Sequence, residues 1–352
     1  MPPTPSPDQP SAQPPAQPPA LHLVLPFAQT GGDPHEAPAL AAWPEALPHL
    51  QALLALASTR HWHRGTLDTR TPPHEWALAL AQGQLPSLPA TLPATTTLPW
   101  AAWEARAHHA HRLPAPNAAA AWFMPAHQEV GMDHVSLHPP ESLRLDDATS
   151  LQLMQALAPL AAEDGITLHW VSAHRWLAVG EVFRGLTVAS PDRVTSPSGE
   201  RSIGPWMADL PPSLRRLQTE AQMLYYTHPA HDQRSQQGLP PVNSVWMAGT
   251  GAASADTPPQ AMRPVDLVHG LRQAALAGDA AAWTRAWLHT DAEVLPAWLD
   301  RARAGEPITV SLCGERSLLR LGFGPRSLGE RWGARISNIF KPQRLNDIQS
   351  LL

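Results

Sequence analysis

The stretch from Leu214 to Gly251 limits the possible folds of this chain more than any other part of it. It begins with a long amphipathic run, which a His-Pro pair ends, and a polar connector follows. A Leu-Pro-Pro-Val-Asn turn then leads into an apolar run that finishes in Gly-Thr-Gly. An apolar stripe at helical spacing predicts a helix with one buried face, and the later apolar run predicts a buried strand. This part of the chain is therefore expected to form a helix and a strand of one layered domain.

The residues before this stretch supply the other elements of an α+β unit. Asp146 and Asp147 stand where an N-cap is expected before an apolar helix, and Gly165 marks the end of that helix. The predicted elements, in chain order, are a strand at 130–137, this helix, strands at 166–171 and 175–180, the helix from Leu214 and a strand at 242–248. Strand, helix, strand, strand, helix, strand is the element order of a ferredoxin-like α+β sandwich.

Apolar and amphipathic runs at both ends of the chain predict a separate α/β core. They comprise a buried strand at 21–28, helices at 44–57 and 71–80, a Pro/Thr-rich loop at 83–99, a helical stretch at 265–304 and a strand at 308–313. We therefore expect an α/β core that consists of residues 21–120 and 252–325, with an α+β insert at 121–251. A Pro-rich arm at 1–20 is expected to be disordered, and a basic tail is expected at 326–352.

The composition excludes several classes of protein. A formal net charge of -5 does not suit a protein that binds nucleic acid or an anionic membrane surface. Cys313 is the single cysteine, so the chain has neither an internal disulfide nor a zinc site built from cysteines. No apolar run approaches the roughly 18–20 residues of a membrane-spanning helix, and the N-terminus lacks the pattern of a signal peptide. A cytoplasmic protein is expected.

Short motifs between residues 122 and 251 carry a resemblance to a known family. In chain order they are Asp133-His134-Val135-Ser136, Leu145-Asp146-Asp147, His174-Arg175-Trp176-Leu177, Phe183-Arg184-Gly185, Asp192-Arg193, His228-Pro229 and Leu239-Pro240-Pro241-Val242-Asn243. This series resembles the substrate domain of the archaeal-type cofactor-independent phosphoglycerate mutases, members of the alkaline phosphatase superfamily. It departs from that family at Ala230-His231, where a Val-Asn pair is usual. The resemblance implies a degenerate alkaline-phosphatase-like core that carries a substrate-type insert.

The layout of the whole chain is also similar to the RpfE-type regulatory proteins of proteobacteria. The segments PPHEWALALA at 72–81 and LCGER at 312–316 fit that family. This second resemblance implies a bacterial regulatory protein that derives from a phosphoglycerate mutase.

Phosphoryl transfer in the alkaline phosphatase superfamily requires a serine nucleophile and two metal ions. The place of the first metal-binding Asp, directly after the first strand, is held here by Pro26-Phe27. Thr71 is the only hydroxyl near the expected nucleophile and stands out of register, and the final Gly-Asp-His is replaced by Gly314-Glu315-Arg316. The resemblance thus implies a pseudoenzyme without identifiable catalytic residues and without a cofactor. A Mn or Zn ion is expected only if displaced ligands form a metal site elsewhere.

Six polar residues lie in segments that border the substrate cleft of the resembled family: Arg175, Arg184, Asp192, Arg193, His228 and Asn243. Arginine forks hold phosphate and carboxylate groups, so the resemblance implies a site for a small phosphorylated or carboxylate ligand. A purely structural role in loops explains the same residues. The histidine pairs His61/His63, His108/His111 and His228/His231 have ligand-like spacing, but no carboxylate-rich strand accompanies them.

Three functions stay open. The favoured hypothesis is a regulatory or small-anion-sensing protein that lacks catalysis. The first alternative is an active metal-dependent cofactor-independent phosphoglycerate mutase or phosphoesterase. The second is a protein–protein interaction module that docks a regulatory protein partner through the Trp-rich stretch at 281–298 and the basic tail. Neither nucleic acid nor a membrane is expected as a partner.

Overall fold

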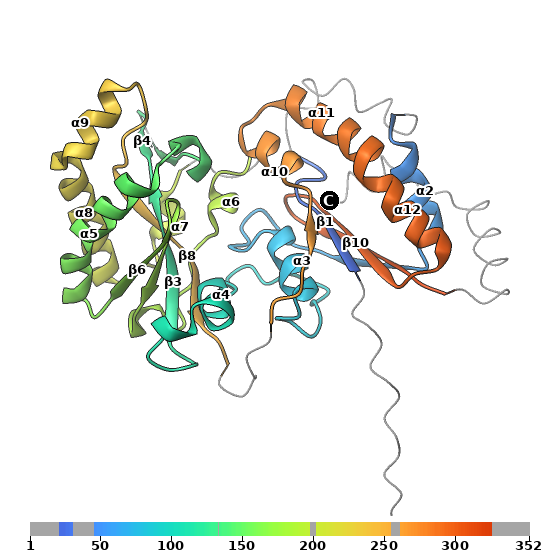
Figure 1. The fold of residues 1–352 in the computed structure, drawn as a ribbon, viewed down its shortest axis with the longest axis horizontal. Coiled ribbons are helices and arrows are strands. Elements are labelled where there is room, and N and C mark those ends of the chain that lie inside the picture. The colour runs from blue at the N-terminus through green and yellow to red at the C-terminus, as the bar shows by residue number, and fades with distance from the viewer. Residues whose placement is uncertain (1–20, 31–45, 133, 198–201, 255–260, 326–352) are drawn as a thin grey trace, which may run out of the picture.

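The computed structural model describes residues 21–30, 46–132, 134–197, 202–254 and 261–325. The predicted Pro-rich arm at 1–20 and the basic tail at 326–352 lie outside the described residues. The described part is α/β and forms two lobes that lie side by side, each around its own sheet (Figure 1). We call residues 21–99 and 261–325 the core lobe and residues 100–254 the second lobe, within the described ranges.

The core lobe is built on a five-stranded sheet. Its strands are β1 (Leu21–Leu25), β2 (Thr59–His63), β9 (Asp266–Leu267), β10 (Ile308–Cys313) and β11 (Leu318–Phe323), in the order β2-β11-β10-β1-β9. Strand β1 runs parallel to β9 and β10, whereas β11 is antiparallel to both of its neighbours. The strands predicted at 21–28 and 308–313 are confirmed, and their pairing brings the two ends of the described chain together.

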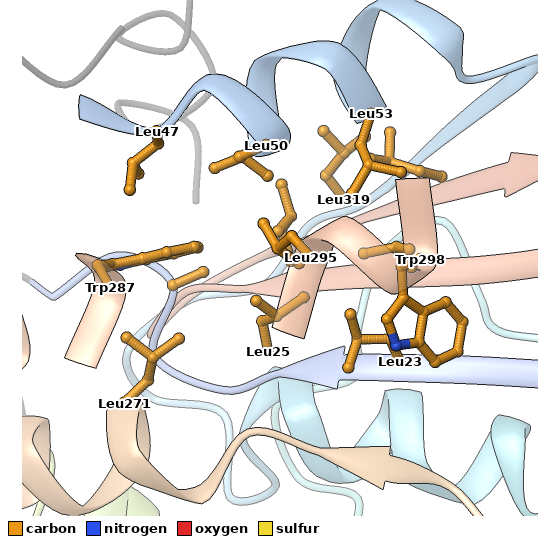
Figure 2. Packing of buried hydrophobic residues seen from close by; sticks show 14 of the residues in the cluster. Leu23, Leu25, Leu47, Leu50, Leu53, Leu271, Trp287, Leu295, Trp298 and Leu319 are labelled. Atoms are coloured by element: carbon orange, nitrogen blue, oxygen red, sulfur yellow. The ribbon is translucent and has the colours of Figure 1, made fainter. Parts of the chain in front are cut away.

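Helices cover both faces of this sheet. On one face lie α2 (Pro48–Leu56), α10 (His269–Leu276), α11 (Ala280–His289), a π-helical turn (Thr290–Val294) and α12 (Leu295–Ala304), and on the other lies α3 (Pro73–Ala81). Alternation along β1 explains the division, since successive side chains of a strand point to opposite faces. Leu23 and Leu25 pack with leucines of α2 and α12 (Figure 2), while Val24 packs on the side of α3.

Three tryptophans of the stretch at 281–298 lie inside the core lobe. Trp283, Trp287 and Trp298 are only 4%, 2% and 5% exposed, and Figure 2 shows Trp287 and Trp298 among the leucines around β1. A docking surface requires side chains that a partner can reach. These tryptophans therefore stabilise the lobe and do not form the surface that an interaction module would need.

The second lobe is built on a four-stranded sheet. Its strands are β3 (Ala119–Ala126), β6 (Thr167–Ser172), β7 (Arg175–Val179) and β8 (Ser244–Ala252), in the order β6-β7-β3-β8, and all neighbours are antiparallel. Helices α5 (Asp147–Glu163) and α8 (Pro212–Thr227) pack on one face, and α4 (Trp100–His108) packs on the other. The chain order is β3-α5-β6-β7-α8-β8, so α4 precedes the first strand of the sheet that it covers.

Short segments complete the second lobe. They are η2 (Ala110–Arg112), β4 (Gln128–Val130), β5 (Val135–Leu137), η3 (Pro140–Leu143), η4 (Glu181–Phe183), α6 (Pro191–Val194), α7 (Gly204–Met207) and α9 (Pro229–Gln236). Strands β4 and β5 form a hairpin that is separate from the two large sheets. Within the described ranges, every helix is too short or too polar to traverse a lipid bilayer.

The first strand of the second lobe differs from the sequence-based prediction. A single strand was expected at 130–137, but these residues belong to the β4–β5 hairpin, and the strand of the main sheet is β3. Its sequence, AAAWFMPA, shows no alternation because seven of its eight residues are buried, with α4 on one face and α5 and α8 on the other. Alanine also has a low strand propensity, so neither periodicity nor composition indicates this strand.

The N-cap predicted at Asp146 is confirmed. Its carboxylate accepts hydrogen bonds from the backbone N–H of Thr149 at 2.8 Å and from the Thr149 hydroxyl at 2.7 Å, and these bonds lower the pKa of Asp146. We expect Asp146→Ala to lower the free energy of unfolding by about 1 kcal/mol, because the first turn of α5 loses an acceptor. Urea denaturation at neutral pH measures this loss. Asp147→Ala keeps the cap and is the matched control, and an equal loss in both variants would contradict the capping role.

Candidate functional site

A cavity of about 270 Å³ lies between the two lobes. Its walls come from α3, β9 and α10 of the core lobe and from α4, β3, β7, β8 and the α6 segment of the second lobe. Trp100 and Trp122 supply aromatic surface, and the titratable or charged lining consists of His74, Glu75, Glu104, Arg175, Asp192 and Arg272. A concave space with aromatic walls and a small number of polar groups is the usual form of a small-molecule site.

The strongest polar feature of this interlobe cavity is a buried ionic network around Asp192. Pro191 begins α6, where its missing N–H is not needed, and Asp192 follows in the first turn. Arg272 of α10 donates two hydrogen bonds to the Asp192 carboxylate, at 2.5 and 2.6 Å, and His74 Nε2 lies 3.0 Å from the same group. Burial alone raises the pKa of Asp192, but the hydrogen bond with His74 and the charge of Arg272 outweigh it and hold this pKa below its usual range.

Arg272 also fastens the two lobes to each other. Besides Asp192 it contacts Glu141 of η3, whose Oε1 accepts a hydrogen bond from Nη1 at 2.7 Å. One side chain of the core lobe thus bridges two carboxylates of the second lobe. Arginine suits this role because its planar guanidinium offers several donors in fixed directions.

Glu75 lies next to this network, in the first turn of α3. The Ser190 hydroxyl donates a hydrogen bond to one carboxylate oxygen, and Trp100 Nε1 donates to the other at 3.2 Å. Burial raises the pKa of Glu75, although the charge of His74 and the hydrogen bond from Ser190 oppose the rise. The helix predicted at 71–80 is confirmed as α3, and its two leading prolines place His74 and Glu75 at the cavity.

Arg175, the first residue of β7, lies on the opposite wall. Its Nη1 donates to Glu104 Oε2 of α4 at 3.0 Å, and its guanidinium carbon lies 4.8 Å from the centre of the Trp122 ring. The side chain is 42% exposed, so it remains accessible to a ligand. Burial raises the pKa of Glu104, and the charge of Arg175 opposes this rise.

Three buried polar atoms of lining side chains have no hydrogen-bond partner among the described residues. They are His74 Nδ1, Gln82 Oε1 and Trp122 Nε1. Because a buried polar group without a partner costs about 1–3 kcal/mol, native structures keep few of them. These three atoms could therefore form hydrogen bonds with a ligand or with water in the cavity.

Of the six residues predicted for an anion site, Arg175 and Asp192 line this cavity. Arg193 is next to Asp192 but points into the protein, where it is 1% exposed and donates to the Glu315 carbonyl at 2.7 Å and to Thr69 Oγ1 at 3.1 Å. Burial lowers the pKa of Arg193 to about 10, although nearby carboxylates oppose this. Arg193 therefore holds the α6 segment against the core lobe.

The other three predicted residues lie elsewhere. Arg184 pairs with Glu181 and lines a different cavity of the second lobe. His228 stands between α8 and α9, where its Nδ1 accepts a hydrogen bond from the N–H of Ala230 at 3.2 Å. Asn243 bonds both the N–H and the carbonyl of Gln128 at 2.8 Å, which fixes the chain before β8.

Several residues of the cavity were not indicated by the sequence. His74, Glu75, Glu104, Ser190 and Arg272 come from four separate segments, and only His74 and Glu75 are adjacent in the sequence. His74 and Glu75 lie in a motif that was singled out for its similarity to a family, but their partners are far away in the sequence. Arg272 lies in a helical stretch in which an arginine is ordinarily a solvated residue.

The residues that follow β1 and β10 do not fit the two-metal centre of the resembled superfamily. Phe27 follows β1 with a positive φ of 50°, and its ring lies 5.4 Å from that of His74. The Glu315 carboxylate accepts a hydrogen bond from the Ser196 hydroxyl and lies near the charge of Arg193. Within the described ranges, no group of three or more His, Cys, Asp or Glu side chains is arranged to hold a metal ion.

No family model matches the sequence, and no curated protein matches it. Similar solved structures include the protein PH0037 from Pyrococcus horikoshii, with a TM-score of 0.44 and 14% identity over 91% of this chain and 96% of that chain. They also include a cofactor-independent phosphoglycerate mutase from Thermoplasma acidophilum, with a TM-score of 0.33 and 14% identity over 88% of this chain and 90% of that chain. Similarity at this level is remote and assigns neither an activity nor a site residue to this chain.

Proposed function

We propose that this protein binds a small phosphorylated or carboxylate ligand in the interlobe cavity and acts as a ligand-sensing regulatory protein that lacks catalysis. The proposal rests on the position, the exposure and the single ion-pair partner of the Arg175 side chain. Its guanidinium reaches the cavity, is accessible, and is held by a single carboxylate, that of Glu104. An acidic ligand can take the place of Glu104 on this guanidinium, because arginine forks bind phosphate and carboxylate groups in the same geometry.

The way in which the polar groups are occupied supports the proposed absence of turnover. The Thr71 hydroxyl, the only one near the nucleophile position expected from the sequence, is 1% exposed and donates to the Thr96 carbonyl at 2.7 Å. The Asp192 carboxylate is held by Arg272 and His74. Groups engaged in this way offer neither a nucleophile nor metal ligands.

The motifs at 122–251 and the order of elements support the ancestry within this proposal. The strand order β6-β7-β3-β8 with the chain order β3-α5-β6-β7-α8-β8 supports the inference of a ferredoxin-like unit. We infer that the protein has a degenerate alkaline-phosphatase-like core that carries such an insert. We also infer that it is a cytoplasmic bacterial pseudoenzyme related to the phosphoglycerate mutases. The RpfE-type similarity of the segments at 72–81 and 312–316 supports a regulatory role.

Titration with 3-phosphoglycerate by isothermal calorimetry tests the proposal. We expect binding by the wild-type protein in EDTA, and a loss of affinity of about tenfold or more in Arg175→Ala, since a charge-assisted hydrogen bond contributes about 1.5–3 kcal/mol. Arg301→Ala is the matched control, because Arg301 also pairs with one glutamate but lies outside this cavity. Equal affinity in the wild type and Arg175→Ala would contradict the assignment.

The same titration should show proton uptake. When the ligand displaces Glu104 from Arg175, the carboxyl loses the charge that opposes its burial, and its pKa rises further. A group whose pKa rises on binding makes binding tighter at low pH, and the gain disappears as the pH rises through the higher pKa. Calorimetry in two buffers of different ionisation enthalpy measures the uptake, and Glu104→Gln should abolish it.

An enolase-coupled assay separates this function from the alternative of an active mutase or phosphoesterase. We expect no conversion of 3-phosphoglycerate with added Mn²⁺ or in EDTA. Turnover that requires Mn²⁺ and is lost in EDTA would overturn the proposal and establish the enzyme.

A further inference from the structure

A second cavity, of about 630 Å³, lies entirely in the second lobe. It is formed by η2 and the loop that follows it, by β6, and by the end of β7 with η4. His169 of β6 pairs with Leu177 of β7, so both side chains lie on the sheet face that α4 partly covers. The cavity therefore occupies the part of that face that α4 leaves open beside η2.

The lining of this second cavity has an excess of basic groups. Four side chains that carry or can take up positive charge line it, namely His111, Arg112, His169 and Arg184, against the single carboxylate of Glu181. This differs from the interlobe cavity, where both lining arginines are bound to carboxylates. We call this second space the basic cavity.

The hydrogen bonds leave much of this positive charge uncompensated. Glu181 is bound to Arg184, whose Nη2 also donates to the Asn117 carbonyl at 3.1 Å. Arg112 donates from Nη1 to the Trp170 carbonyl at 2.8 Å, and no ion pair joins it to a carboxylate among the described residues. The Arg112 guanidinium thus lines the cavity without a carboxylate counter-ion among the described residues.

The basic groups also affect one another. Burial lowers the pKa of His169, and the charges of Arg112 and His111, which line the same cavity, lower it further. Several positively charged side chains placed close together destabilise a fold unless a negative charge compensates them. A bound anion would supply this negative charge, and a cavity of this volume is large enough for a small organic ligand.

We propose that the basic cavity is a second binding site, distinct from the interlobe cavity, for a small phosphate-bearing anion. Arg112 offers its remaining donors to the phosphate oxygens, and Arg184 adds a donor from the opposite side of the cavity. His169 takes up a proton when the anion binds. The Thr167 hydroxyl and the Asn117 amide provide neutral hydrogen bonds in the same lining.

Inorganic phosphate and pyrophosphate are the probes for this site, and the full chain is used. Binding is followed by calorimetry and by the imidazole resonances of His169 in NMR spectra. We expect Arg112→Gln and His169→Gln each to weaken binding, the former by about tenfold or more, and Arg112→Lys to retain part of the affinity. Arg301→Ala, which removes an exposed arginine of α12, should have no effect.

The pH dependence gives an independent readout. The titratable and charged groups that line the cavity around His169 are Arg112 and His111 from η2, Glu181 from η4, and Arg184 directly after η4. Bound phosphate should raise the pKa of His169, so the affinity should increase as the pH is lowered through that value. His169→Gln should reduce this increase, whereas a variant that merely disturbs the fold would change the unfolding transition instead.

The possible results separate this site from the proposed function. Loss of phosphate binding in Arg112→Gln with full retention in Arg175→Ala supports the basic cavity. Loss in Arg175→Ala with retention in Arg112→Gln places the anion in the interlobe cavity and overturns the inference. Absence of binding of either probe up to about 10 mM, which corresponds to an affinity near 3 kcal/mol, also overturns it.

Discussion

Replacement of Arg272 by methionine is expected to lower the free energy of unfolding by about 3–5 kcal/mol, the usual cost when one partner of a buried ion pair is removed. Asp192 would keep His74 but lose the guanidinium that binds both of its oxygens. The contact with Glu141 across the lobes would disappear as well. Urea denaturation at neutral pH measures the loss.

The pH dependence identifies the cause of this destabilisation. The pKa of Asp192 is depressed in the native protein, so the network contributes stability above the pKa of an unfolded aspartate, about 3.9, and loses it as the pH falls through the lower native value. The stability difference between the wild type and Arg272→Met should therefore shrink as the solution becomes acidic. A constant difference would show that lost packing, rather than the uncompensated carboxylate, is responsible.

A double variant provides the matched control. Arg272→Met with Asp192→Asn removes the carboxylate together with its partner, and it should be more stable than Arg272→Met alone because no buried charge is left uncompensated. Arg215→Ala, on the exposed part of α8, controls for the loss of an arginine as such and should change stability little. Additive effects of the two substitutions at 272 and 192 would contradict the proposed network.

Substitution of Gly249 by alanine is the second prediction with a large effect. Gly249 has a φ of +59°, and a Cβ atom there would lie 2.9 Å from Trp100 Cβ and 3.2 Å from the backbone N of Ala101. The left-handed conformation costs an alanine about 1–2 kcal/mol, and overpacking against α4 adds about 1–3 kcal/mol. We expect a loss of about 2–5 kcal/mol in the free energy of unfolding.

Gly238→Ala separates the two contributions. Gly238 has a similar φ of +67°, but nothing lies within 4 Å of an added Cβ. Its substitution should cost only the conformational part, about 1–2 kcal/mol. If both alanine variants were destabilised equally, the close approach of α4 to β8 would not be the reason for glycine at 249.

Gly249 also shapes the candidate site. It lines the interlobe cavity together with Trp100 and Trp122, and its missing side chain lets α4 lie directly on the sheet. The Gly-Thr-Gly sequence was expected to follow a strand that ends at 248, but β8 continues through it to Ala252. A variant that folds should consequently bind an interlobe ligand more weakly, because α4 carries Trp100, which lines this cavity.

Local sequence signals predicted the elements that have a single buried face or a clear cap. Helix α5 begins after the predicted cap at Asp146, and it ends before Gly165, which has the left-handed φ of +71° that a C-terminal glycine adopts. Helix α8 and strand β8 were predicted from the amphipathic run and the apolar run between Leu214 and Gly251. These features depend on neighbouring residues, so periodicity is sufficient to find them.

Other elements gave no local signal of this kind and were not predicted. Strand β3 is buried on both sides and rich in alanine, and α4 begins after a proline-rich loop in which no helix was expected. Strand β11 lies in a region whose structure the sequence left ambiguous, and it pairs with β2, more than 250 residues earlier in the chain. Pairings of this kind depend on the whole sheet, and no short window of sequence contains them.

For the candidate site, the sequence by itself brought Arg175 and Asp192 to attention through their motifs, but it did not indicate their partners. Only the tertiary structure decided that Asp192 meets Arg272 and His74, and that Arg175 rests on Trp122 beside Glu104. The physical reason is that capping and amphipathic burial act between residues close in the chain. Ion pairs and cavities form between residues that folding brings together, and their energies depend on burial and distance that a sequence does not contain.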